Sequence, residues 1–123
     1  MNASQRPLLN HTLFHWAAIS WTIIMAVGCF WPSQGLPDPT TYNDKYLHIL
    51  IFLAFGAAWR AAGWPISRIL LAGLLYGGFI EIVQALVPAI HRDGDWLDFA
   101  ADAVGVVIGL GIGQFVVRMT RER

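Results

Sequence analysis

Hydrophobic residues in this chain gather into four long runs separated by short polar stretches. The runs cover residues 12–31, 46–64, 69–90 and 99–117. Each has about the 20 residues that an α-helix needs to cross a hydrocarbon core of about 30 Å, at about 1.5 Å per residue. The pattern predicts an all-α protein, a bundle of four transmembrane helices that forms a single domain over residues 1–123.

Two of the runs need a closer look. The second is the weakest, because Arg60 lies near its end, although a long arginine side chain there can reach the membrane interface. The first is too long for the apolar part of a signal peptide and ends in FWPS, with no small-residue cleavage site. We therefore interpret both as membrane spans.

The composition supports lipid as the solvent. Only 13% of the residues are charged and 56% are hydrophobic, whereas soluble domains carry about 25% charged residues. The few basic residues give no surface for binding nucleic acid, so we expect no nucleic-acid partner. The single cysteine, Cys29, lies in an apolar run, which excludes an intramolecular disulfide and favours a buried structural thiol.

Basic and acidic residues fall on opposite sides of the predicted bundle. With the N-terminus inside, the inner side holds Arg6, Arg60, Arg68, Arg118, Arg121 and Arg123, and the outer side holds Lys45 and Arg92. This bias predicts that both termini are cytoplasmic. Of the acids, Glu122 lies inside and Glu81 lies within the third run, and the rest lie toward the outer side: Asp38, Asp44, Asp93, Asp95, Asp98 and Asp102.

Helical spacing places the polar residues on one face of each of three helices, at similar depths in the outer half of the bundle. The second helix would carry Asp44, Lys45 and His48, the third Glu81 and Gln84, and the fourth Asp95, Asp98 and Asp102. Packing of the three helices could bring these side chains together as one pocket.

Glu81 is the most informative of these residues. A charged acid within a span costs about 2.5–3.5 kcal/mol on insertion scales, so it usually faces a polar interior and marks function. Raised in pKa by desolvation, Glu81 could exchange protons with a His48 oriented by Asp44. The alternative is an acid that only holds helices together. For Asp98, a substrate-facing role and a helix-capping role are equally compatible with the sequence.

Other chemistries remain open or are disfavoured. A divalent metal is possible, because His48, Glu81 and the aspartates offer nitrogen and oxygen ligands, but no known metal motif is present. Arg92 either pairs with neighbouring aspartates or clamps a phosphate or carboxylate. The GLGIG segment is not a dinucleotide loop, since Gly105, Gly109 and Gly113 recur every four residues as a face for close helix contact.

In order and spacing, these residues resemble the VanZ-like family of small bacterial membrane proteins. The resemblance covers residues 44–113 and rests on D-K-x-x-H, on E-x-x-Q in the next span, and on an arginine followed by spaced aspartates and a glycine. The matching residues are Asp44, Lys45, His48, Glu81, Gln84, Arg92, Asp95, Asp98 and Gly105. The chain departs from the pattern at Asp102, where an asparagine is expected.

The resemblance implies a multi-pass protein of the bacterial inner (cytoplasmic) membrane and an association with low-level resistance to teicoplanin, a lipid-bearing glycopeptide antibiotic. We expect a pocket for an amphipathic or anionic envelope ligand: a lipid head group, a lipid-linked cell-wall intermediate or a glycopeptide. Membrane lipids are then partners, and the oligomeric state stays open. His48, Glu81 and Asp98 are the catalytic candidates, and the substrate-binding candidates are Asp44, Lys45, Gln84, Arg92, Asp95 and Asp102.

The residues do not decide whether the protein is an enzyme. Two alternatives to a ligand pocket remain at this point. One is a small transporter or proton or ion conduit with Glu81 as the relay, which is disfavoured by the lack of repeats and broken helices. The other is a non-catalytic membrane scaffold in which the polar residues only order the bundle.

Overall fold

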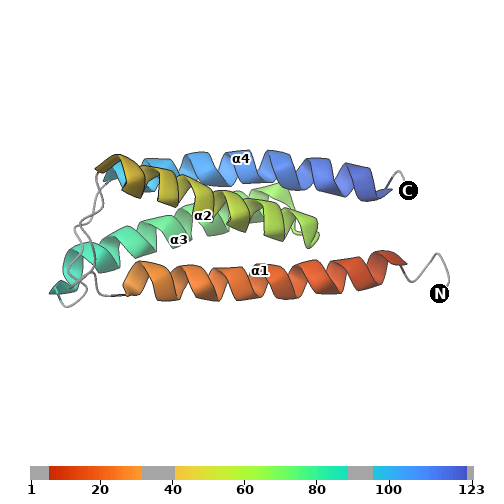
Figure 1. The fold of residues 1–123 in the computed structure, drawn as a ribbon, viewed down its shortest axis with the longest axis horizontal. Coiled ribbons are helices and arrows are strands. Elements are labelled where there is room, and N and C mark those ends of the chain that lie inside the picture. The colour runs from red at the N-terminus through yellow and green to blue at the C-terminus, as the bar shows by residue number, and fades with distance from the viewer. Residues whose placement is uncertain (1–5, 32–40, 89–95, 122–123) are drawn as a thin grey trace.

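The chain forms a bundle of four helices in which each helix runs antiparallel to the next one in the chain (Figure 1). The computed structural model describes residues 6–31, 41–88 and 96–121. Its helices are α1 (Arg6–Phe30), α2 (Thr41–Ala61), α3 (Ile66–Leu86) and α4 (Trp96–Arg121), and the described residues contain no strand. Helices α2 and α4 share the most extensive interface, and α1 contacts α2 and α3 (Figure 1). The predicted all-α class is confirmed.

The helices do not coincide with the hydrophobic runs. Helix α2 begins at Thr41, so it includes the polar stretch that precedes residue 46. Helix α3 covers residues 66–86 instead of the expected 69–90, since Pro65 stands at its N-cap and Val87, which precedes Pro88, is extended with φ −109° and ψ 97°. Between α2 and α3 the chain turns at Gly63, whose φ is +99°.

Three of the helices are long and apolar enough to cross a membrane: His11–Phe30, Ile66–Leu86 and Trp96–Thr120. Helix α2, which carries Lys45 and Arg60, is not one of the three. Large apolar side chains cover the outside of the bundle, as at Leu75, which is 65% exposed, and Phe115, which is 63% exposed. A surface of this kind is suited to contact with lipid rather than water.

The middle of the bundle is filled by aromatic rings. Phe55 lies 5.9 Å from Tyr76 between ring centroids, and Phe52 lies 6.1 Å from both rings. The polar atoms of the buried rings reach helix α1: Tyr76 Oη donates to the carbonyl oxygen of Thr22 at 2.9 Å, and Trp59 Nε1 donates to its hydroxyl oxygen at 3.0 Å. These hydrogen bonds satisfy groups that would be costly in an apolar interior, and they attach α1 to the other helices.

Helices α2 and α4 approach each other closely because glycines line their interface. A Cβ atom at Gly56 of α2 would lie 2.7 Å from the carbonyl oxygen of Val106, and one at Gly113 of α4 would lie 2.8 Å from that of Ala57. A Cβ atom at Gly109 would overlap the main chain at Leu53. The predicted small-residue face is therefore the contact surface between α4 and α2.

We expect Gly109→Ala to destabilise the protein by about 1–3 kcal/mol, because the added methyl group forces the two backbones apart. The matched control is Gly111→Ala, since a Cβ atom there meets no atom within 4 Å. It should leave stability unchanged or raise it by up to about 1 kcal/mol through helix propensity. Thermal unfolding in detergent measures both, and equal Tm values for the two variants would contradict the interpretation of this interface.

Candidate functional site

Polar side chains from three helices meet at one end of the bundle, where α2 and α4 begin and α3 ends (Figure 1). Five of them are buried in a largely apolar protein: His48, Glu81, Gln84, Asp98 and Asp102, with relative exposures of 7%, 9%, 4%, 4% and 1%. Together with the half-buried Lys45 they form what we call the polar cluster. Three helical segments that are far apart in the sequence thus contribute side chains to one site.

His48 lies at the centre of the cluster, between two aspartates of α4. Its Nδ1 atom is 2.6 Å from Oδ1 of Asp102, a hydrogen-bond distance, and its Nε2 atom is 3.7 Å from Oδ2 of Asp98. Both aspartates lie on the same face of α4 because they are four residues apart. The contact with Asp102 orients the imidazole ring, as a carboxylate commonly does for a histidine that exchanges protons or binds a metal.

Asp98 is shared between His48 and Lys45. The Lys45 ammonium group donates a hydrogen bond to Oδ1 of Asp98 in an ion pair whose side chains are 22% and 5% exposed. Lys45 precedes His48 by almost one helical turn, so α2 presents both of them to α4. The lysine charge therefore compensates the buried charge of Asp98.

Glu81 completes the centre of the cluster from α3. One carboxylate oxygen of Glu81, one ring nitrogen of His48 and one carboxylate oxygen of Asp102 all lie within 4.8 Å of one another. All three residues are buried. The predicted convergence of α2, α3 and α4 is therefore present in the structure, with Glu81 facing the interior rather than lipid.

Glycines in the neighbouring turns of α3 make room for the side chains of the polar cluster. Gly77, one turn before Glu81, leaves room for Asp102, since a Cβ atom at Gly77 would lie 3.0 Å from Oδ2 of Asp102. Gly73, Gly77, Glu81 and Gln84 all belong to the buried face of α3. Sequence reasoning found the glycine face of the fourth helix and missed this one, although its four-residue steps in GLLYGGFIE carry the same signal.

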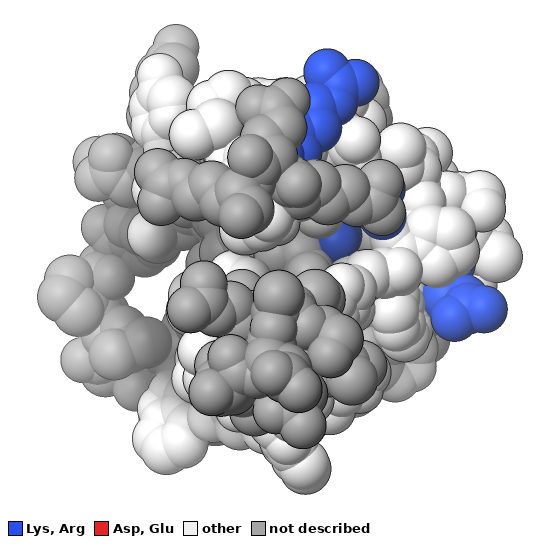
Figure 2. All heavy atoms as spheres, turned by 90° about the vertical axis from the view of Figure 1, so that its right-hand side faces the viewer, with Lys and Arg blue, Asp and Glu red and all other residues white. Residues whose placement is uncertain are grey.

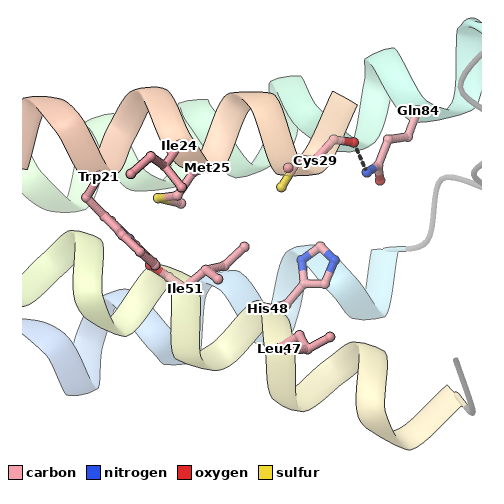
Figure 3. Close-up of a pocket in the computed structure, with 9 residues that line it drawn as sticks. Trp21, Ile24, Met25, Cys29, Leu47, His48, Ile51 and Gln84 are labelled. Carbon is pink, nitrogen blue, oxygen red and sulfur yellow. Dashed lines mark hydrogen bonds between the residues drawn. The ribbon is translucent and has the colours of Figure 1, made fainter. Parts of the chain in front are cut away.

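An apolar cavity leads to the cluster from the side of the bundle. It has a volume of about 260 Å³ and lies between α1 and α2 (Figure 3). Its apolar wall includes Trp21, Ile24, Met25, Leu47 and Ile51, and its polar lining residues are His48 and Gln84. Gln84 also donates a hydrogen bond from Nε2 to the carbonyl oxygen of Cys29 at 2.9 Å, which connects α3 to the end of α1 (Figure 3). Cys29 is buried, as predicted.

No sequence motif indicated this cavity, because its walls are ordinary apolar residues of α1. Trp21 donates a hydrogen bond from Nε1 to the carbonyl oxygen of Ile51 at 2.9 Å and closes the cavity at the end away from His48. Gly28 contributes no side chain to the wall, and a Cβ atom there would meet nothing within 4 Å. The cavity is therefore open at this exposed glycine.

Some predicted site residues fall outside the described part. Asp44 belongs to α2, but its side chain is not described, and Arg92 and Asp95 lie between α3 and α4 in residues 89–95, which the structure does not describe. The structure brings together five of the other predicted residues, and the sixth, Gln84, lines the same cavity as His48. The five are Lys45, His48, Glu81, Asp98 and Asp102.

The opposite end of the bundle has the opposite charge. Arg60 lies in the last turn of α2, Arg68 near the start of α3 and Arg118 near the end of α4. Figure 2 views the bundle from this end, and the charged side chains coloured in it are all basic. Arg60 donates hydrogen bonds to Oε1 of Gln114 at 2.8 Å and to the carbonyl oxygen of Trp64 at 2.9 Å. The three acidic side chains that the structure describes are all in the polar cluster.

Membrane-like helices around a buried polar cluster define an α-helical membrane protein. The family model described as VanZ/LLP1 matches residues 2–117, and the chain belongs to this family. The resemblance seen in residues 44–113 is thereby confirmed and extended to nearly the whole chain. No curated protein and no solved structure is significantly similar to the chain.

We expect Lys45→Met to destabilise the protein by about 3 kcal/mol, because it leaves the buried Asp98 carboxylate without its lysine partner. The lower end of the range for buried pairs applies because the Lys45 side chain is 22% exposed. Adding Asp98→Asn should recover part of the loss. Chemical unfolding of the single and double variants in detergent measures the coupling, and additive effects would show that the two side chains act independently.

Proposed function

We propose that this VanZ-family protein binds an amphipathic ligand of the cell envelope, with the apolar part of the ligand in the cavity and its polar part at the polar cluster. The main support for the proposal is that the cavity has an apolar part and a polar part. Its wall is apolar along α1 and α2, while His48 and Gln84 are its polar lining residues. Ligand pockets with an apolar body and a few convergent polar groups bind molecules of this kind.

The route to the cavity supports a ligand that arrives from lipid. Ile24 and Leu47 line the cavity and are 56% and 54% exposed, so they belong both to its wall and to the outer surface of the bundle. A molecule dissolved in the membrane reaches the cavity between α1 and α2 without passing through water. Candidate ligands are an envelope lipid, a lipid-linked cell-wall intermediate or a lipid-bearing glycopeptide such as teicoplanin, which would connect binding to low-level resistance.

The charge distribution supports an outward-facing site. We infer that all four helices span the bacterial cytoplasmic membrane with both termini inside, because the arginines gather at the end where α1 begins and α4 ends. The polar cluster then lies in the outer half of the membrane. Helix α2 spans despite its charges, since Arg60 is hydrogen-bonded at the inner end and Lys45 is paired at the outer end.

The cluster favours a polar group that donates hydrogen bonds. Lys45 is paired with Asp98, so its charge is not the main attraction for an anion in this arrangement. His48 and Gln84 offer the ring and amide groups that face the cavity, and a hydroxyl, amine or amide of the ligand can bond to them. If a bond of the ligand is broken, His48 would exchange the proton, held in position by Asp102, with Glu81 as the second acid or base.

A scaffold role is the second candidate. It is favoured by the pairing of cluster residues with one another, Lys45 with Asp98 and His48 with Asp102. A scaffold protein would need these side-chain pairs for stability, and it would not need the neighbouring cavity. The two functions therefore differ in what happens when the cavity is filled while the pairs are left intact.

Filling the cavity separates the two functions. Gly28→Phe introduces a ring at a cavity-lining residue and leaves every side chain of the polar cluster unchanged, and we expect it to lower retention of co-purified lipid at least about tenfold, a cost of about 1.4 kcal/mol. Lipid extracted from the purified protein and quantified by mass spectrometry measures retention. Gly111→Ala, away from the cavity, is the control and should retain lipid as the unmodified protein does.

Glu81→Gln provides the second arm of this experiment. A binding site predicts altered retention of ligand with a folded protein, whereas a scaffold predicts a lower Tm and unchanged retention. Unchanged lipid content and unchanged teicoplanin susceptibility in both Gly28→Phe and Glu81→Gln would overturn the ligand-binding proposal.

The membrane orientation is checked by reporter fusions to the C-terminus. A fluorescent protein that matures in the cytoplasm should be active there, and a phosphatase that requires export should be inactive. The opposite pair of results would place the polar cluster on the cytoplasmic side. Adding basic residues between α1 and α2 should weaken the preference for cytoplasmic termini, because membrane orientation follows the excess of arginine and lysine in short segments.

A further inference from the structure

The polar cluster gathers side chains of the kinds that bind metal ions. Glu81, Asp98 and Asp102 contribute carboxylates and His48 an imidazole ring, and all four residues are buried. Buried charged groups in proteins are paired with other groups or coordinate a metal ion.

The geometry singles out three of these residues as ligands. His48, Glu81 and Asp102 offer one nitrogen and two oxygen atoms that all lie within 4.8 Å of one another, and each residue comes from a different helix. All three are buried, with exposures of 7%, 9% and 1%. Asp98 is the remaining acid of the cluster, and it is occupied by Lys45.

We propose that His48, Glu81 and Asp102 bind a divalent transition-metal ion, with Zn²⁺ as the reference ion. Imidazole suits zinc and its neighbours in the first transition row, whereas Mg²⁺ and Ca²⁺ take oxygen ligands almost exclusively. Zinc sites with three protein ligands from histidine and carboxylate keep a further position open for water or substrate. His48 also borders the cavity, so the open position would face the polar end of the ligand pocket.

Small side-chain movements convert the observed arrangement into a metal site. His48 Nδ1 and Asp102 Oδ1 are 2.6 Å apart, a hydrogen-bond distance. Metal bonds of about 2.0–2.1 Å set two ligands of a tetrahedral ion about 3.3 Å apart. An ion would therefore replace this hydrogen bond if the two atoms separated slightly and Glu81 moved inward.

The surroundings of His48 match those of a metal-binding histidine. When one ring nitrogen binds a metal, the other normally donates to a carboxylate that fixes the ring. His48 Nε2 lies 3.7 Å from Oδ2 of Asp98, just beyond hydrogen-bond distance, and Lys45 is paired with that carboxylate. A small rotation of the ring would bring these two atoms within hydrogen-bond distance.

The metal site stands on the ligand geometry and does not depend on lipid binding. The test uses the full chain in detergent, stripped with EDTA and then titrated with ZnCl₂. We expect about one Zn²⁺ per chain by elemental analysis and a Tm that rises with zinc until the site is filled. Addition of Co²⁺ instead should give visible absorption bands of a low-coordinate nitrogen and oxygen site, and Zn²⁺ should abolish them.

Variants assign the ligands. Asp102→Asn keeps the size of the side chain, and with Glu81→Gln it should weaken zinc binding at least about a hundredfold, since even outer-shell changes cost about 10–100-fold. The double variant His11→Ala, His15→Ala removes two histidines of α1 outside the cluster and should bind zinc unchanged. Gly28→Phe should also bind zinc normally, so that a failure of the lipid proposal leaves this result intact.

The proposal is overturned if the unmodified protein holds no stoichiometric zinc after titration, or if Asp102→Asn and Glu81→Gln bind it as tightly as the unmodified protein. If either variant fails to fold, the Co²⁺ spectrum of the unmodified chain decides the matter alone, and the absence of zinc-displaceable bands refutes the site.

Discussion

The close approach of α2 and α4 is the constraint on which the rest of the molecule depends. Glycines on both helices bring the two backbones together along their length, because a Cβ atom at Gly56 or Gly109 would collide with the facing main chain. Only at this separation can short aspartate side chains of α4 reach His48 and Lys45 of α2. The glycines are remote from any chemistry, and they set the distances on which the polar cluster relies.

Burial of charge in the cluster follows from the same contact. In lipid a lone carboxylate is expensive, so three acids in one place require compensation. Lys45 is paired with Asp98, and His48 is at hydrogen-bond distance from Asp102. Glu81 enters from α3 at the point where Gly77 opens space beside Asp102. Five groups from three helices are thereby held together in a largely buried site, where electrostatic interactions are strong.

The sequence allowed a large part of this arrangement to be predicted. The four helices followed from the length of the hydrophobic runs, and the facing of Glu81, His48 and Asp102 followed from helical spacing and from the cost of an acid within a span. The helix ends were less accurate: at α3 the neighbouring prolines, and not hydrophobicity, set the first and last residues. The partners of His48 were only partly foreseen: Asp102 of a distant helix is at hydrogen-bond distance from the ring, and the expected neighbour, Asp44, has a side chain outside the described part.

The cavity was beyond sequence reasoning for a physical reason. Apolar residues that line a space and apolar residues that fill one look alike in a sequence, and the difference depends on how far α1 stands from α2. The hydrogen bond from Trp21 to the carbonyl oxygen of Ile51 holds α1 against α2, and the one from Gln84 to the carbonyl oxygen of Cys29 holds the end of α1 against α3. Every residue has a carbonyl group, so these bonds restrict the identity of the donors and not of the acceptors. The side chains at positions 29 and 51 could therefore change the shape of the cavity lining while both hydrogen bonds, which use only their main chain, are kept.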